Sequence, residues 1–165
     1  MRTLTLVRHA KSSWKDINLS DYDRPLNKRG KRDLPLLCQR LQAQDIRPDL
    51  ILYSPALRTK ITAEQIHKHL NLPKEHIEPC LNLYEASEMT LLSLIQRTAP
   101  EKQHLMLVGH NPGLENLANL LLGNALSHFP TTAVVHMIID LNDWSSLSHH
   151  HAKCSWFDYP KLHQD

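Results

Sequence analysis

Thr3-Leu4-Thr5-Leu6-Val7-Arg8-His9, near the start of the 165-residue chain, is the stretch that decides the predicted fold. Residues 3–7 alternate β-branched and apolar side chains, a composition that favours a short buried strand. The run stops abruptly at the polar pair Arg8-His9. Two more short apolar runs end at polar residues in the same way: Leu50–Tyr53 before Ser54-Pro55, and Leu105–Val108 before Gly109-His110.

Helical patterns lie between these strands. We expect helices from about residue 56 to Leu70, around Leu91–Ile95, and from Leu114 to Leu122, where Gly123 is a plausible C-cap. Three further strands are expected at His76–Pro79, Ala133–Leu141 and Trp156–Tyr159.

The helix before the second strand has two possible starts. Leu34, Leu37, Cys38 and Leu41 recur at helical spacing. Pro35 would fit the first turn of a helix that starts near Asp33, because the missing N–H is unpaired there anyway. A longer helix starting near Asn27, where Asn27 could cap it, would have to contain Pro35 and kink there.

Alternating strands and helices predict an α/β fold with three αβα layers around a mostly parallel sheet. The length argues for one domain over residues 1–165. Parallel strands place their carboxyl ends along one edge of a sheet, where ligands bind. The polar residues that follow the three buried strands should therefore gather at that edge.

Composition narrows the function classes. Apolar residues make up 41% of the chain and charged residues 22%, which is ordinary for a soluble protein. A net charge of +2 without a basic stripe argues against a nucleic-acid partner, and no apolar run is long enough for a membrane span. Cys38, Cys80 and Cys154 are odd in number and widely spaced, so we expect reduced, mostly buried thiols in a cytoplasmic protein.

The predicted edge collects a charge set that suits a tetrahedral dianion. Arg8 and Arg58 supply guanidinium groups, whose planar fork matches phosphate oxygens. His9 and His110 supply imidazoles, which can act as nucleophiles or donors. Two guanidinium groups near His9 should lower its pKa below the ordinary value of about 6.5 and keep the ring neutral.

These motifs resemble the histidine phosphatase superfamily, which includes the phosphoglycerate mutases, and in particular its small SixA-type phosphohistidine phosphatases. The likeness extends from residue 1 to about residue 120 and is looser beyond it. Four segments carry it: Leu6–Lys11, Asp23–Gly30, Ser54–Lys60 and Leu107–Pro112.

The resemblance implies a phosphoglycerate mutase-like fold and a catalytic role for each matching residue. His9 attacks phosphorus and becomes transiently phosphorylated, Arg8, Arg58 and His110 bind the phosphoryl oxygens, and water then releases phosphate. The resemblance implies no cofactor and no metal. The chain departs from the family at Ala10, which replaces the usual glycine, and at Lys11, where mutases often have glutamate.

Larger family members supply a general acid from an inserted lid, for which this chain has little room. Glu85 is the best-placed candidate acid, and it is equally consistent with an ordinary surface residue. A phosphohistidine needs less acid assistance than an alkyl phosphate ester, because its leaving imidazole can take a proton from solvent. The missing lid therefore favours a phosphorylated protein, such as a histidine-containing phosphotransfer domain, as the partner.

The sequence is also consistent with other functions, to different degrees. A phosphatase for small metabolites, such as sugar or nucleotide phosphates, is the main alternative. A mutase is less favoured because the chain is short, and a non-catalytic phosphate-binding module is disfavoured because His9 and both arginines are present. The run His149–His151 suggests a solvated loop rather than a metal site, since adjacent residues do not easily converge on one ion.

Overall fold

All six strands of the computed structural model, which describes residues 1–148 and 152–164, join a single sheet in the order β3-β2-β4-β1-β5-β6. His149–His151 lie outside the described residues. The strands are β1 (Arg2–Arg8), β2 (Leu50–Tyr53), β3 (Ile77–Pro79), β4 (His104–Gly109), β5 (Val134–Ile139) and β6 (Ala152–Asp158).

The first four strands in sequence run parallel, while β5 and β6 are antiparallel to their neighbours. The prediction of an α/β fold with a mostly parallel sheet is thus confirmed, with an antiparallel pair at one edge. The antiparallel direction of β5 follows from where it begins, because residues 123–133 return the chain to the carboxyl end of β1. Thr131 and Thr132 turn the chain beside the end of β1, so β5 runs back along it in register from Val7↔Val134 to Arg2↔Ile139.

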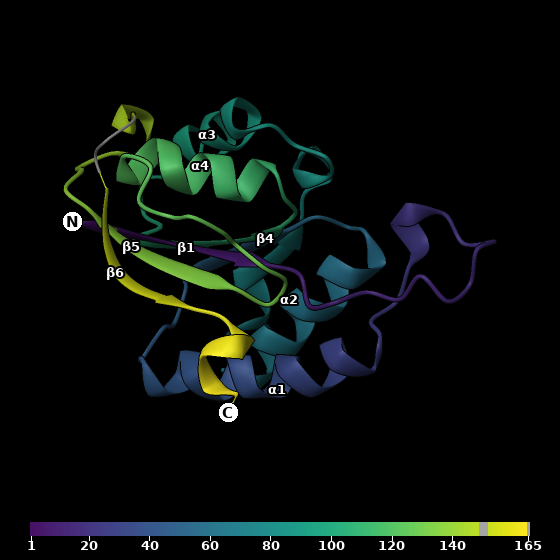
Figure 1. Ribbon diagram of the computed structural model, residues 1–165. Helices are drawn as coiled ribbons and strands as arrows, with labels where there is room; N and C mark the ends of the chain where they lie inside the picture. Colours follow the sequence, from purple (N-terminus) through teal and green to yellow (C-terminus); the bar gives the residue numbers. More distant parts are fainter. Residues whose placement is uncertain (149–151, 165) are drawn as a thin grey trace.

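Two helices cover each face of the sheet (Figure 1). They are α1 (Lys28–Ala43) and α2 (Leu57–His69) on one side, and α3 (Glu88–Gln96) and α4 (Gly113–Leu122) on the other. Side chains alternate across each strand. Leu4 and Leu6 of β1 therefore pack with α3 and α4, whereas Val7 packs with α1 and α2. The three expected αβα layers are confirmed.

Helix α1 resolves the ambiguity at Pro35 in favour of the longer helix. It begins at Lys28, and the Asn27 side chain accepts a hydrogen bond from the Gly30 N–H at 2.8 Å. Pro35 lies inside the helix. A side chain at Gly30 would collide with the Lys11 carbonyl oxygen. This close approach holds the segment that follows β1 against the start of α1.

The three cysteines are free, but their burial differs from the expectation of mostly buried thiols. Cys38 is buried on α1, Cys80 is half-buried, and Cys154 is exposed on β6. Cys154 is exposed because β6 is an edge strand, whose outer residues have no further strand or helix to cover them. Within the described residues, the structure contains no helix with the length and apolarity needed to cross a membrane.

Candidate active site

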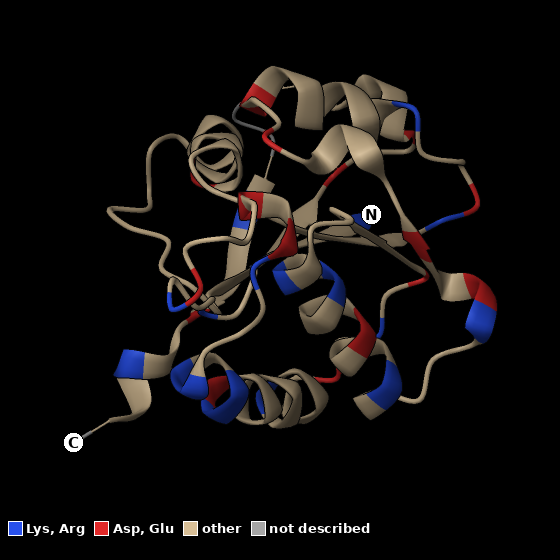
Figure 2. Ribbon diagram, turned by 90° about the vertical axis from the view of Figure 1, so that its right-hand side faces the viewer, with Lys and Arg blue, Asp and Glu red and all other residues tan. Residues whose placement is uncertain are grey.

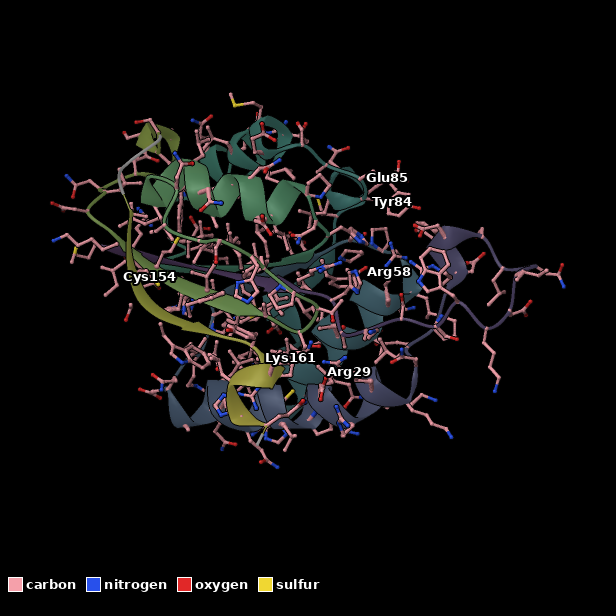
Figure 3. All side chains as sticks on the ribbon, in the orientation of Figure 1. Arg29, Arg58, Tyr84, Glu85, Cys154 and Lys161 are labelled. Atoms are coloured by element: carbon pink, nitrogen blue, oxygen red, sulfur yellow. The ribbon has the colours of Figure 1, made fainter. Side chains whose placement is uncertain are left out.

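A cavity of about 550 Å³ opens where β1, β2 and β4 end. Figure 2 looks onto this end of the sheet, and Figure 3 shows Arg58 beside it. All four residues predicted to hold the phosphoryl group line the cavity: Arg8, His9, Arg58 and His110. These residues are far apart in sequence, and they meet because the three strands are neighbours in the sheet.

His9 has one ring nitrogen fixed and the other available. Its Nδ1 lies 2.8 Å from the Ala10 carbonyl oxygen, which can only accept, so Nδ1 carries the proton. The lone pair is consequently on Nε2, the nitrogen that a nucleophile needs. Although the residue is only 6% exposed, it lines the cavity and is open to a ligand from that side.

The two arginines keep hydrogen-bonding capacity for a ligand. Arg8 makes one long hydrogen bond, 3.3 Å from Nη1 to the Phe129 carbonyl oxygen. Arg58 is buried at the start of α2 and lies 3.3 Å from His110 through its Nη2. The Nε atoms of Arg8 and Arg58 are buried and lack a partner in the part of the chain that the structure describes. Buried donors of this kind are normally satisfied, so an acceptor from a ligand would fit here.

His110 bridges Arg58 and a buried serine. Guanidinium nitrogens only donate, so the His110 Nδ1 accepts from Arg58 and its Nε2 carries the proton. This Nε2 donates to the Ser54 Oγ at 2.7 Å, and Ser54 is fully buried at the end of β2. The His110 ring lies 5.4 Å from the His9 ring, measured between centroids.

Thr62 joins two of the motifs directly. Its Oγ1 accepts from the Ala10 N–H at 3.0 Å and donates to the Arg58 carbonyl oxygen at 2.7 Å. The backbone that follows His9 is therefore tied to the first turns of α2. The His9 N–H also donates to the Gly109 carbonyl oxygen, next to His110. These bonds fix the spacing of the catalytic candidates.

Both imidazoles are neutral at ordinary pH. Burial is the largest cause that lowers the pKa of His9 to about 3, and the nearby His110, Arg58 and Arg8 lower it further. Burial and then Arg58 likewise lower the pKa of His110 to about 4. The predicted direction for His9 is confirmed, but desolvation outweighs the guanidinium groups to which we assigned it.

Both the sequence and the fold of this chain have similar known proteins. Residues 4–90 match the family model described as histidine phosphatase superfamily, branch 1. The chain belongs to the histidine phosphatase superfamily. The family predicted from the motifs is thus confirmed.

The relatives of this histidine phosphatase include a solved structure of nearly the same extent. The putative phosphohistidine phosphatase SixA of Agrobacterium tumefaciens is 30% identical, with a TM-score of 0.83 over 96% of this chain and 98% of that one. This likeness confirms the SixA-type fold that the motifs predicted.

Two sequence relatives differ more in length. An uncharacterised chloroplast protein of Arabidopsis thaliana is 33% identical over 76% of this chain, which spans 61% of the length of that protein. Phosphoserine phosphatase 1 of Hydrogenobacter thermophilus is 39% identical over 44% of this chain and 34% of its own.

Asp21 is a residue of this histidine phosphatase site that the sequence did not indicate. It lines the cavity, and Oδ2 accepts from Arg58 at 3.0 Å and from the Tyr84 hydroxyl at 2.7 Å, while Oδ1 accepts from Arg24 at 3.0 Å. Burial opposes its ionisation, but the hydrogen bonds from Tyr84, Arg58 and Arg24 outweigh this and lower its pKa to about 2. Asp21 is thus the carboxylate that pairs with Arg58.

Glu85 is not brought into the cavity. It is exposed on the loop between β3 and α3, next to Tyr84 (Figure 3). The Tyr84 ring lies 5.5 Å from the His110 ring, measured between centroids. The backbone of Glu85 has a left-handed φ of 55°. A general acid must come within hydrogen-bonding reach of the leaving group. The role of Glu85 as an acid therefore stays a prediction, and Asp21 is the carboxylate that lines the cavity.

The segment between β1 and α1 contributes more than its sequence suggested. Lys11, Ser12 and Trp14 line the cavity. Arg24 donates to the Ser12 Oγ at 2.6 Å and stacks 3.5 Å from the centre of the Trp14 ring. Arg24 therefore shapes the wall of the cavity while it holds this segment together.

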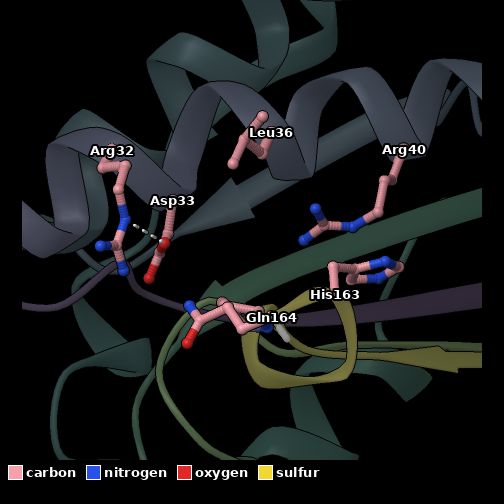
Figure 4. Close-up of a pocket in the computed structure, with 7 residues that line it drawn as sticks. Arg32, Asp33, Leu36, Arg40, His163 and Gln164 are labelled. Carbon is pink, nitrogen blue, oxygen red and sulfur yellow. Dashed lines mark hydrogen bonds and ion pairs between the residues drawn. The ribbon is translucent and has the colours of Figure 1, made fainter.

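A second cavity, of about 280 Å³, lies between α1 and the C-terminal turn (Figure 4). It shares no residue with the cavity at the strand ends. Arg32 donates to Asp33 at 3.2 Å, and Asp158, a buried carboxylate nearby, accepts from Arg40 and from His163. The Arg40–Asp158 ion pair and the hydrogen bond from His163 to Asp158 attach the C-terminal turn to α1, which accounts for the charged residues found there.

Proposed function

We propose that this chain is a phosphatase that hydrolyses phosphohistidine in a protein, through a covalent phosphoryl group on His9. One observation carries the proposal: the Ala10 carbonyl oxygen fixes the His9 tautomer, with the Nε2 lone pair free in a cavity that Arg8, Arg58 and His110 share. A neutral imidazole can attack phosphorus, whereas an imidazolium has no lone pair to offer.

The first step transfers the phosphoryl group to His9. A bond forms between the His9 Nε2 and phosphorus as the bond from phosphorus to the substrate imidazole breaks, and the departing imidazole takes a proton from solvent. Charge on the phosphoryl oxygens is stabilised by the guanidinium groups of Arg8 and Arg58. Because these cations are held in place by the fold, little reorganisation is needed during the reaction.

His110 is suited to assist this reaction because the Ser54 hydroxyl can hydrogen-bond to either tautomer of the His110 ring. In this structure His110 accepts from Arg58 and donates to the Ser54 Oγ. A hydroxyl can donate as well as accept. When a phosphoryl oxygen is present, the proton can reside on the His110 Nδ1 and the Ser54 hydroxyl can donate to Nε2. His110 thereby becomes a donor to the phosphoryl group.

The second step releases phosphate. A water oxygen bonds to phosphorus as the bond from phosphorus to the His9 Nε2 breaks, which yields inorganic phosphate and a neutral His9. The low pKa of His9, about 3, favours this outcome because the ring is a better leaving group than an ordinary imidazole. Neither step requires a carboxylate at the position of Glu85 when the substrate is a phosphohistidine.

Replacement of His9 tests the covalent step. We expect His9→Ala to abolish turnover of a phosphohistidine peptide and to leave no acid-labile phosphoenzyme after quenching, while calorimetry still detects phosphate binding through the arginines. His69→Ala, an exposed change on α2, is the control and should retain full activity. Turnover that survives in the His9 variant would rule out the mechanism.

A phosphatase for small phosphoesters is the second candidate, and the partial match to a phosphoserine phosphatase favours it. The two candidates differ in their substrates. Comparison of kcat/KM for a phosphohistidine peptide with the values for phosphoserine and sugar phosphates separates them. Preference for the small esters would overturn the assignment to protein phosphohistidine.

A further inference from the structure

Besides Arg24, which pairs with Asp21, three basic residues line the cavity beyond the groups assigned to the phosphoryl site. Lys11 follows β1, Arg29 lies in the first turn of α1, and Lys161 lies in the C-terminal turn (Pro160–His163). Figure 2 shows basic residues on the first turns of α1 beside the C-terminal turn, and Figure 3 labels Arg29 and Lys161. We call these three residues the basic rim.

The charge of the basic rim is poorly neutralised by the protein. Across residues 1–148 and 152–164, no carboxylate forms an ion pair with Lys11 or Lys161. Arg29 is 3.6 Å from Asp33, which also pairs with Arg32 at 3.2 Å. Like charges gathered on one concave surface repel each other and attract anions.

The acidic residue of the cavity does not neutralise the positive charge of the basic rim. Asp21 is the acidic residue among the described residues that line the cavity, and Arg58, Arg24 and Tyr84 already occupy its oxygens. A single phosphoryl group is bound by Arg8, Arg58 and the two imidazoles in the proposed function. The basic rim is therefore available to a second anionic group on the same substrate.

Exposed apolar side chains on the segment that follows Lys11, one of which lines the cavity, favour a protein as the source of that anion. Trp14 is 74% exposed and Ile17 is 91% exposed, and both lie on the segment between β1 and α1 that projects beyond the sheet (Figure 1). Exposed aromatic and apolar residues beside a charged site are typical of surfaces that contact a protein. A small metabolite in the cavity would leave Ile17 without a contact.

We propose that the basic rim binds aspartate or glutamate side chains that flank the phosphorylated histidine of a protein substrate. The proposal rests on the proposed function and adds a preference for acidic sequence context. Because Lys11 and Lys161 are exposed, the attraction should weaken as salt screens it.

Two chemically phosphorylated histidine peptides test the proposal, one with Asp and Glu around the phosphohistidine and one with Asn and Gln instead. We expect the wild-type protein to favour the acidic peptide by about tenfold in kcat/KM at low salt, and less at high salt. The variant Lys11→Gln/Arg29→Gln/Lys161→Gln should reduce this ratio to about one. The control Lys68→Gln/Lys74→Gln/Lys153→Gln removes the same charge from exposed positions outside the cavity and should keep the ratio.

The outcomes separate this proposal from the proposed function. Failure of the wild-type protein to hydrolyse N-phosphoimidazole or either peptide would overturn both. Hydrolysis of both peptides at equal rates, or a preference that persists in the rim variant, would overturn the role of the rim and leave the phosphatase assignment intact. A rim variant that is impaired on phosphoserine and retains the peptide preference would also overturn it, in favour of a metabolite carboxylate.

Discussion

Arg58 donates to Asp21 twice, from Nη2 to the Oδ2 at 3.0 Å and from Nη1 to the backbone carbonyl oxygen at 2.7 Å. The guanidinium group that is proposed to hold the phosphoryl group is thus already paired with a carboxylate of the protein. A bound dianion must share Arg58 with this negative charge. Asp21 therefore holds the arginine in position at a cost in affinity for phosphate.

Asp21→Asn should tighten phosphate binding. Asparagine keeps an oxygen that can accept from Arg58 but carries no charge. Removal of a negative charge roughly 5 Å from a bound anion in a solvated site is worth about 1 kcal/mol, which corresponds to about a fivefold lower inhibition constant for inorganic phosphate. Asp16→Asn, in the same segment but outside the cavity, is the matched control. An unchanged or higher constant in the Asp21 variant would show that the carboxylate does not compete with phosphate.

Ser54→Ala should slow catalysis through His110. The change removes the only group that the described residues offer to the His110 Nε2, 2.7 Å away. Loss of one neutral hydrogen bond is worth about 1 kcal/mol, so we expect kcat/KM to fall about fivefold to tenfold. The ¹⁵N chemical shifts of His110 should change their tautomer pattern in parallel. Ser93→Ala, an exposed change on α3, controls for loss of a hydroxyl. Full activity together with altered ¹⁵N shifts of His110 would show that the tautomer of His110 does not affect the reaction.

Sequence patterns predicted the structural features that depend on residues close together in the chain. Strand ends placed Arg8, His9 and His110, because strand β1 and strand β4 are parallel and end together. The predicted C-cap at Gly123 is confirmed, and Asn27 caps the longer of the two helices that the pattern around Pro35 left open. These features need only a local pattern and the geometry of a parallel sheet.

Features that depend on tertiary contacts escaped prediction. Asp21 lies in a segment without periodicity, and its importance arises only when that segment folds back onto Arg58, 37 residues away in sequence. Ser54 gave no signal for its contact with His110, 56 residues away. The size of the pKa shift of His9 likewise depends mainly on burial, which cannot be inferred from the charged residues nearby in the sequence.

Glu85→Gln should distinguish esters from phosphohistidine. An alkyl alkoxide needs a proton as it leaves, and a general acid typically contributes 100-fold or more, whereas imidazole can be protonated by water. If Glu85 acts as the acid, phosphoserine hydrolysis should fall at least tenfold, while a phosphohistidine peptide loses less than twofold. Glu75→Gln, an exposed change that lies outside the cavity, is the control. Equal effects on the two substrates would remove Glu85 from the mechanism.

His104→Gln should make the fold less sensitive to acid. The Thr5 Oγ1 lies 2.7 Å from the His104 Nε2 and 2.7 Å from the His136 Nδ1, within the sheet. Burial, followed by repulsion from His136, lowers the pKa of His104 to about 4. In the unfolded chain an imidazole titrates near 6.5. Between pH 6.5 and pH 4 the unfolded state therefore binds a proton that the folded state does not, so the native protein loses stability as the pH falls through this window.

Glutamine does not titrate, so the variant lacks this contribution. Between pH 6 and pH 5, the free energy of unfolding of the wild-type protein should fall by about 1 kcal/mol more than that of the variant, as measured by urea denaturation. Between pH 7.5 and pH 8.5, imidazole is neutral in both states, and the two proteins should show the same pH dependence. Parallel stability curves below pH 6 would mean that His104 is protonated in the folded protein, in conflict with its burial beside Thr5 and His136.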